Sequence, residues 1–375
     1  IGSGLVGSEM CIRDRKKREM TQKNVSKKDK LTPKDYLNKV LAGTATGIVV
    51  GLIPNAILGS IFKGLIGVSP IFSTFYNAVN IMQFIVPVLV GVLVGLQFEL
   101  NAMQSVIVGA AVFLGSGAFK VTEAGVQMVG IGDLINIMLV SCIAVFVIRL
   151  IGNKLGSLTI LLLPIIAGAG VGIIGMFMLP YVRQITIVIG DIMNNFTTLQ
   201  PLLMCILISV SFSILIISPI STVAIGIAIG ITGLGAGAAA IGVTACTAVL
   251  VAGSRRVNQS GVTLSVLLGA MKMMMPNLVK SPIIAVPIIA NGILSGIGAY
   301  LFNILGTPNS AGFGIVGLVG PLAAINTPGA TNAIFGVIMA FFVIPFVGAF
   351  IIEWFCRKVI HLYLSLIHIS EPTRP

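Results

Sequence analysis

The sequence predicts an all-α polytopic membrane protein. Of its 375 residues, 56% are hydrophobic and only 9% are charged, whereas a soluble domain carries about 25% charged residues. The mean hydropathy is +1.08, and the 44 glycines suit membrane helices that pack at close range. We expect about eight to ten transmembrane helices, with re-entrant segments and an amphipathic interfacial helix.

Both ends of the chain are expected to be foreign to it. Residues 4–15 and 364–375 can be encoded by opposite strands of one oligonucleotide, and they resemble a translated sequencing adapter. We therefore assign 1–15 to this adapter and a short leader, and 359–363 to a truncated native C-terminus. The transmembrane domain is expected to span 40–358.

Basic residues gather in 16–39, directly before the first apolar run. A nucleic-acid role would need a folded reader or interleaved aromatic residues, and the stretch has neither. The positive-inside rule explains the cluster, because Lys and Arg hold a flanking segment in the cytoplasm and contact anionic lipid there. A cytoplasmic N-terminus and no nucleic-acid partner are expected.

Five apolar runs in the first half of the chain are long enough to cross a bilayer. The less hydrophobic stretch 63–80 follows the first run, and residues 120–133 are expected to form a polar loop. In 181–200, apolar residues recur at near-helical spacing among charged ones, which predicts the interfacial helix. The five runs are 40–62, broken at Pro54-Asn55, then 80–98, 103–119, 134–151 and 158–179.

The second half contains an apolar stretch, 222–252, that is too long for one straight span. It is expected to split around Gly233 and Gly235 into two helices or a re-entrant pair. Lys and Arg residues at the ends of alternate spans place both termini in the cytoplasm. The other apolar runs are 202–217, 262–275, 283–305 and 333–352.

One segment between two long apolar runs is too rich in Gly and Pro to be a regular spanning helix. It reads SAGFGIVGLVGP, residues 310–321, and the turn Asn326 to Asn332 follows it. Backbone that is neither helix nor barrel survives at membrane depth only when it is buried in protein or lines a wet cavity. We expect this segment to be a re-entrant gate beside a solute site.

A sugar site needs amide and carboxylate groups for the hydroxyls, preferably on broken helices. The turn from Asn326 to Asn332 is the strongest candidate, since Pro328 and Gly329 leave backbone groups that need partners. Lys272 is expected to reach the surface. The candidate substrate-binding residues are Asn326, Asn332, Ser310, Asn277, Glu99, Asp133, Asn136 and Asn55.

Several of these residues have an equally good structural interpretation. Glu99 and Asp133 lie at the edges of spans, where an acid commonly caps a helix or faces the interface. Asn55 follows Pro54 and can equally satisfy a kinked backbone. The sequence leaves these alternatives open.

The sequence contains no nucleotide-binding loop and no hydrolase or metalloprotease motif. Its cysteines stand singly in or beside apolar runs, without the paired spacing of metal ligands or disulfides. We expect no catalytic residue, no metal and no cofactor in this chain.

Five sequence motifs are spread along residues 31–358. They are GVQMVGIGDLIN (125–136), KLGSLTILLLP (154–164), SPISTVAIGIAIG (218–230), GAMKMMMPN (269–277) and SAGFGIVGLVGP (310–321). In these motifs the chain resembles a bacterial family of membrane enzyme IIC components of the phosphoenolpyruvate-dependent sugar phosphotransferase system. That family includes proteins described as toxin regulators, similar to the perfringolysin regulator.

This resemblance implies a sugar permease in the bacterial cell membrane. It would bind an external sugar and expose it inward, where a phosphocysteine of a separate IIB protein phosphorylates it. No residue matches the IIB cysteine or IIA histidine loops, so IIA and IIB are expected as separate chains, and related permeases imply a homodimer. Whether such a transport component counts as an enzyme stays open.

Two other functions compete with the permease. One is a membrane sensor of the toxin-regulator type that no longer transports. The other is a secondary transporter coupled to ions, which needs membrane-buried acids. Glu99 and Asp133 are expected only at span edges, which counts against ion coupling.

Overall fold

The structure is a computed structural model that describes residues 32–123, 125–152, 154–327 and 333–358. It divides into two compact units, Ile1–Asn38 and Lys39–Pro375. The described part of the first unit is the start of α2 (Pro33–Pro54). There the Asp35 amide donates to Thr32 Oγ1 over 3.2 Å, which caps the helix. All that follows concerns the second unit.

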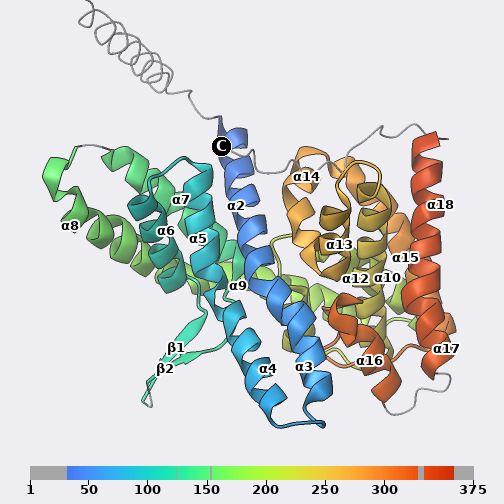
Figure 1. The fold of residues 1–375 in the computed structure, drawn as a ribbon. Helices are drawn as coiled ribbons and strands as arrows, with labels where there is room; N and C mark the ends of the chain where they lie inside the picture. Colours follow the sequence, from blue (N-terminus) through green and yellow to red (C-terminus); the bar gives the residue numbers. More distant parts are fainter. Residues whose placement is uncertain (1–31, 124, 153, 328–332, 359–375) are drawn as a thin grey trace, which may run out of the picture. The chain divides into compact units, whose positions relative to one another are not determined.

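A first helical bundle forms around α6 (Figure 1). Glycines let its helices touch backbone to backbone: a Cβ on Gly43 of α2 would lie 2.6 Å from the Val94 Cα of α5. Larger residues there would push the helices apart. With α2, the bundle consists of α5 (Val86–Gln97), α6 (Ala102–Gly115), α7 (Leu134–Ile151) and α9 (Val171–Phe196).

A second bundle surrounds α12 (Gly233–Ser254), which has 89% of its apolar window buried and is therefore the central helix. A Cβ on Gly242 of α12 would lie 2.2 Å from the Ser209 carbonyl oxygen, so this contact also requires glycine. The helices packed around α12 are α10 (Pro201–Leu215), α15 (Ala285–Leu301) and α18 (Ile344–Lys358).

Each bundle contains one buried asparagine that joins three helices. Asn136 of α7 donates from Nδ2 to the carbonyls of Gly115 in α6 (2.6 Å) and Gly175 in α9 (3.0 Å). Asn291 of α15 donates in the same way to Ala245 in α12 (2.9 Å) and to the Pro345 carbonyl in α18 (3.0 Å). Such bonds replace the water that a membrane interior lacks.

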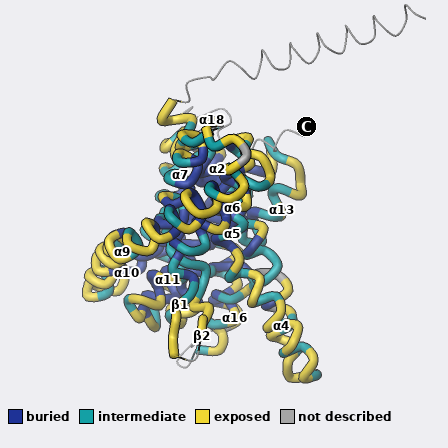
Figure 2. The backbone as a smooth tube through the Cα atoms, turned by 90° about the vertical axis from the view of Figure 1, so that its left-hand side faces the viewer, coloured by how far each residue is buried: buried dark blue, intermediate teal, exposed yellow. Residues whose placement is uncertain are grey.

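Pro54 does not end its helix, contrary to the expected break. The π-helical turn Asn55–Gly59 follows it directly and leads into α3 (Ser60–Leu65). A widened turn accommodates the missing proline N–H, so the chain bends without leaving the helix. The less hydrophobic stretch 63–80 is largely helical, since α4 covers Ile71–Met82. Figure 2 shows α4 without buried residues.

The expected polar loop at 120–133 begins instead as a β-hairpin. Strands β1 (Phe119–Thr122) and β2 (Gly125–Met128) pair antiparallel, with Phe119 opposite Met128. Apolar and polar residues alternate in this stretch, a period-two pattern that favours strands. Phe119 also stacks on Phe113 of α6, with 5.3 Å between ring centroids, which holds the hairpin against the bundle.

Other predicted elements are confirmed. The stretch 222–252 splits into α11 (Thr222–Ala228) and α12, as expected. Within the described ranges, seven helices are long and apolar enough to cross a membrane, and three shorter apolar helices accompany them. These helices give the expected all-α polytopic membrane architecture.

Shorter elements connect these helices. The helix that contains the interfacial stretch runs unbroken from α8 to Phe196 through a π-helical turn. The elements not yet given are α8 (Thr159–Leu163) with the turns Gly156–Leu158 and Pro164–Gly170, the turn Gln83–Ile85, α13 (Ser260–Leu268), the turn Ala270–Met274, α14 (Met275–Lys280), the turn Pro282–Ile284, the turn Val316–Leu318, α16 (Val319–Asn326), α17 (Ala333–Val337) and the turn Ile338–Val343.

Replacing Asn136 by alanine should destabilise the protein, because two buried carbonyls lose their donor. We expect a loss of about 1–3 kcal/mol. Unfolding of the purified protein can be followed through the fluorescence of its one tryptophan, Trp354. The matched control is Asn195→Ala, at an exposed position of α9, and equal stability of both variants would show that the Asn136 bonds contribute nothing.

Candidate functional site

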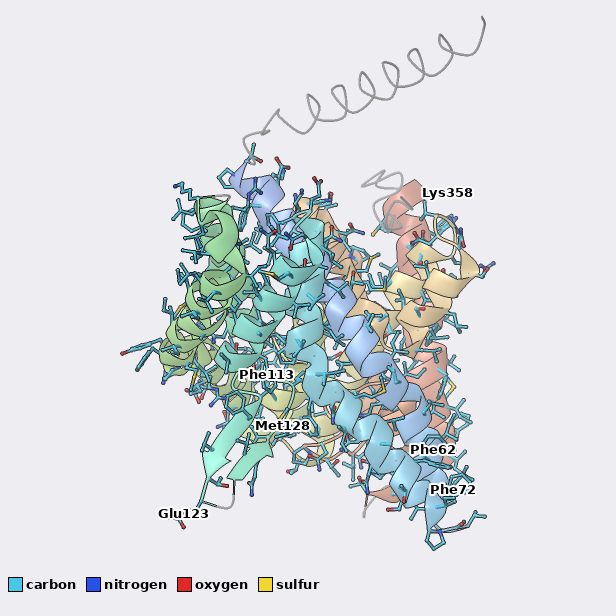
Figure 3. All side chains as sticks on the ribbon, turned by 60° about the vertical axis from the view of Figure 1, so that its left-hand side comes forward. Phe62, Phe72, Phe113, Glu123, Met128 and Lys358 are labelled. Atoms are coloured by element: carbon cyan, nitrogen blue, oxygen red, sulfur yellow. The ribbon has the colours of Figure 1, made fainter. Side chains whose placement is uncertain are left out.

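The second bundle has two distinguishable ends. At one end Arg256, just after α12, lies 4.0 Å from Glu353 of α18. We call this the basic end, and Figure 3 shows Lys358 there and Glu123 of the β-hairpin at the opposite end. At that opposite end Gly233 and Gly306 exchange two backbone hydrogen bonds of 3.0 and 2.9 Å.

Residues 303–326 form a hairpin that enters from the end opposite the basic end. We call it the glycine hairpin. It begins beside α12 at Gly306, has turns from Pro308 to Ile315, and returns through α16. The predicted irregular backbone at 310–321 is therefore present, and no helix runs continuously from Gly312 to Gly320.

Glycines let this hairpin lie directly on the backbone of α11. A Cβ on Gly312 would be 2.3 Å from the Val223 backbone nitrogen, a distance that no side chain can occupy. Thr222 Oγ1 donates to the Gly312 carbonyl over 2.9 Å in the same contact. The carbonyl of an irregular segment thus gains a buried donor.

The glycine hairpin reverses at Val316–Leu318. Gly317 and Leu318 both have positive φ, at 58° and 57°. A leucine in this left-handed region carries about 1 kcal/mol of strain or more, which is typical of functional sites. This tip contacts the π-helical turn Asn55–Gly59 and α13.

Residues 260–280 form a second hairpin, which starts and ends at the basic end. We call it the basic-end hairpin. It descends through α13, reverses at Ala270–Met274 and returns through α14. Met275 of α14 packs with Leu41 and Ala45 of α2, so this hairpin also contacts the first bundle.

Lys272 lies in the reversal of the basic-end hairpin. Contrary to expectation, its side chain does not reach the surface. The residue is 8% exposed. Its Nζ donates to the carbonyls of Ser218 (2.6 Å) and Ile220 (2.9 Å), in the turn between α10 and α11. The expectation was wrong because these carbonyls offer the ammonium a buried partner that sequence periodicity does not reveal.

The two hairpins approach the midpoint of α12 from opposite sides. Gly314 lies against Val243, with 2.8 Å between its hypothetical Cβ and Val243 Cγ1. The turn Ala270–Met274 that contains Lys272 contacts α12, and Met271 and Met274 share a buried cluster with Val243 and Cys246. Interrupted segments that meet at mid-depth of a helical bundle are the usual setting of a transporter substrate site.

A polar cluster lies beside this meeting point. Asn80 Oδ1 accepts from Gln83 Nε2 over 2.5 Å and from Asn55 Nδ2 over 3.5 Å. All three residues are half-buried, and the turn that begins with Asn55 contacts the glycine-hairpin tip. The amides leave further donors and acceptors for a polyhydroxyl ligand.

Three predicted site residues lie in the first bundle, and two of them, Asn136 and Asp133, bond within or between its helices. Asn136 is the buried residue, described above, that joins α7 to α6 and α9. Asp133 accepts from the Asn136 amide over 3.0 Å and caps α7, which is the capping alternative considered for this acid. Glu99 is exposed in the turn after α5, with φ at 59°. None of the three lies in the polar cluster.

Ser310, Asn277 and Asn326 belong to the two hairpins. The Ser310 hydroxyl is buried and bonds the amide and carbonyl of Thr307, which closes a turn. Asn277 is half-buried in α14, and its Nδ2 lies 3.5 Å from Met274 Sδ. Asn326 is exposed at the end of α16, and Asn332 lies outside the described residues.

Sequence reasoning missed Asn80, Gln83 and Glu353. The first two stand three residues apart, a helical spacing that places them on one face. Glu353 lies near the end of the last span and has a side chain only 4% exposed. Its position beside Arg357 and Lys358 made it resemble one more interfacial charge.

Within the described part of the chain, no three His, Cys, Asp or Glu side chains gather where a metal ion could bind. The cysteines described are free thiols, of which Cys205, Cys246 and Cys356 are buried.

Comparison with known proteins identifies a family for most of the chain. The profile described as "Phosphotransferase system, EIIC" matches residues 38–368. The match includes both hairpins and the polar cluster. No curated protein and no solved structure matches the chain.

Replacing Gly312 by alanine should disrupt the contact between the glycine hairpin and α11. The added Cβ would lie within 2.6 Å of backbone atoms of Thr222 and Val223, so we expect a loss of several kcal/mol or a failure to fold. Thermal unfolding in detergent measures it. Gly261→Ala is the control, since its Cβ would meet nothing within 4 Å, and equal stability of the two variants would contradict the close approach.

Proposed function

The chain belongs to the phosphotransferase system EIIC family, and on this basis we propose that it is the permease through which such a system takes up a sugar. As a multi-pass membrane protein of this family, it would act in the cell membrane of a bacterium. The sugar would bind from outside and be exposed to the cytoplasm within the same helical scaffold.

The observation that carries this proposal is the meeting of two interrupted hairpins at the midpoint of α12. Each hairpin enters from a different end, so each could admit solute from one side of the membrane. The left-handed pair Gly317 and Leu318 at one tip suits a segment that changes conformation between the two states.

The proposed sugar contacts are Asn55, Asn80 and Gln83. Their amides can donate to and accept from hydroxyl groups, which orient a sugar with directional bonds. Asn326, where the glycine hairpin returns, is kept as a proposed contact, and Asn332 is kept on the sequence argument alone. Ser310, Asn277, Glu99, Asp133 and Asn136 would then act by holding the surrounding backbone.

Phosphorylation would come from a separate IIB protein at the basic end. There the phosphoryl group would leave a cysteine sulfur of IIB and join a sugar hydroxyl oxygen, while the hydroxyl proton passes to the thiolate that is released. The exposed Arg255, Arg256 and Lys358 support a cytoplasmic orientation of that end, and of both termini, through the positive-inside rule. IIA would recharge IIB, and the permease would act as a homodimer.

Ion-coupled transport is the second candidate, and Glu353 is the observation that favours it. This acid is buried in the last span, and its Oε2 has no hydrogen-bond partner. Buried carboxylates of this kind serve as ion or proton sites in secondary transporters. Arg256 lies 4.0 Å from the other oxygen of Glu353, Oε1. The alternative is therefore that Glu353 has a structural role, as the partner of Arg256.

Reconstituted vesicles distinguish the candidates. We expect sugar to accumulate inside as its phosphate only when phosphorylated IIB is supplied on the side of the basic end. Radiolabelled sugar and sugar phosphate can be separated and counted. Uptake of free sugar driven by an ion gradient would establish the second candidate, whereas binding without any uptake would indicate a sensor.

Replacing Asn80 by alanine should weaken sugar binding by about tenfold or more, because it also removes the acceptor that orients Asn55 and Gln83. Titration calorimetry on the purified protein measures the affinity. Asn77→Ala is the matched control, at an exposed position one turn earlier on α4.

Asn326→Ala is expected to abolish binding without unfolding the protein, and unchanged affinity would remove that residue from the site.

A further inference from the structure

The turn between α10 and α11 directs two backbone carbonyls to one point. Its donors are used locally: the Ser218 hydroxyl bonds the Leu215 carbonyl over 2.7 Å, and the Ile220 amide bonds that hydroxyl over 3.1 Å. The Ser221 hydroxyl accepts from the Ala224 amide over 3.2 Å and caps α11. The carbonyls of Ser218 and Ile220 thus remain to be satisfied from outside the turn.

Lys272 Nζ satisfies both carbonyls, at 2.6 and 2.9 Å. Among the described residues, the one ion pair joins Arg256 to Glu353, so no carboxylate lies within 4.0 Å of this amine. A buried side-chain amine is therefore held by carbonyl dipoles instead of an acid.

Carbonyls from an unwound segment between two half-helices are the ligands that bind Na⁺ in ion-coupled transporters. We propose that Lys272 is a tethered cation, an ammonium that occupies the position of a coupling ion in the α10–α11 turn. Because the charge is covalently attached, the broken helices need no free Na⁺ or K⁺.

The tethered cation also joins the two hairpins. Lys272 belongs to the basic-end hairpin and binds the α10–α11 turn, while Thr222 at the start of α11 binds Gly312 of the glycine hairpin. A chain of two polar contacts therefore links segments that enter from opposite ends. Loss of the ammonium should release both hairpins, whatever solute the protein carries.

The test compares the native protein with Lys272→Ala, Lys272→Met and Lys272→Arg in detergent. Unfolding midpoints are measured in salts of choline, Na⁺, K⁺, ammonium and methylammonium at equal ionic strength. Methylammonium is the probe for the missing side-chain end, and choline is a cation too large to enter. Lys280→Ala removes an exposed lysine of the same hairpin and is the matched control.

We expect the native midpoint to be the same in all salts, and Lys272→Ala to have a lower midpoint that methylammonium or ammonium raises in a saturable way. Lys272→Met keeps the stem and should stay destabilised in every salt, whereas Lys280→Ala should behave as the native protein. Specific stabilisation by Na⁺ or K⁺ of native protein that persists in Glu353→Gln, which removes the other possible ion site, would overturn the proposal.

Two further outcomes would also overturn it: a Lys272→Met midpoint equal to the native one, or a Lys272→Ala midpoint that no small cation raises. If Lys272→Ala does not fold, the native salt series and Lys272→Met still decide. None of these measurements needs sugar, so the result is independent of the proposed transport function.

Discussion

Backbone carbonyls at broken helices must find donors inside the protein, and the rest of the structure depends on how this is done. In a membrane interior an unpaired carbonyl costs several kcal/mol. Lys272 supplies the donors for the α10–α11 turn, and Thr222 supplies one for Gly312. Asn136 and Asn291 instead join helices within the two bundles. Lys272 and Thr222 therefore permit the irregular backbone of the α10–α11 turn and of the glycine hairpin.

Close approach is the second requirement, and glycine meets it. The glycine hairpin can rest on α11 and α12 only because Gly312 and Gly314 lack a Cβ. Short distances between backbones strengthen dispersion and leave no room for water. The lack of a side chain also lets Gly317 adopt positive φ at the tip, where the neighbouring Leu318 is strained.

Much of the architecture was predictable because composition and period report directly on local structure. Apolar length predicted the spans, and the excess of Gly and Pro predicted irregular backbone at 310–321. The β-hairpin at 119–128 was missed, although its alternation was visible, because a polar loop was the simpler interpretation. Pro54 was taken for a break because sequence cannot show that a π-helical turn absorbs it.

The sequence by itself determined that the chain crosses a membrane with many helices, and it singled out Asn55 as a site candidate. Only the tertiary structure decided that Asn80 and Gln83 join Asn55, and that Lys272 is buried on two carbonyls. Hydrophobicity and period are properties of neighbouring residues, so they are readable along the chain. Polar partners 25 to 54 residues apart are brought together by tertiary packing, which no local sequence pattern predicts.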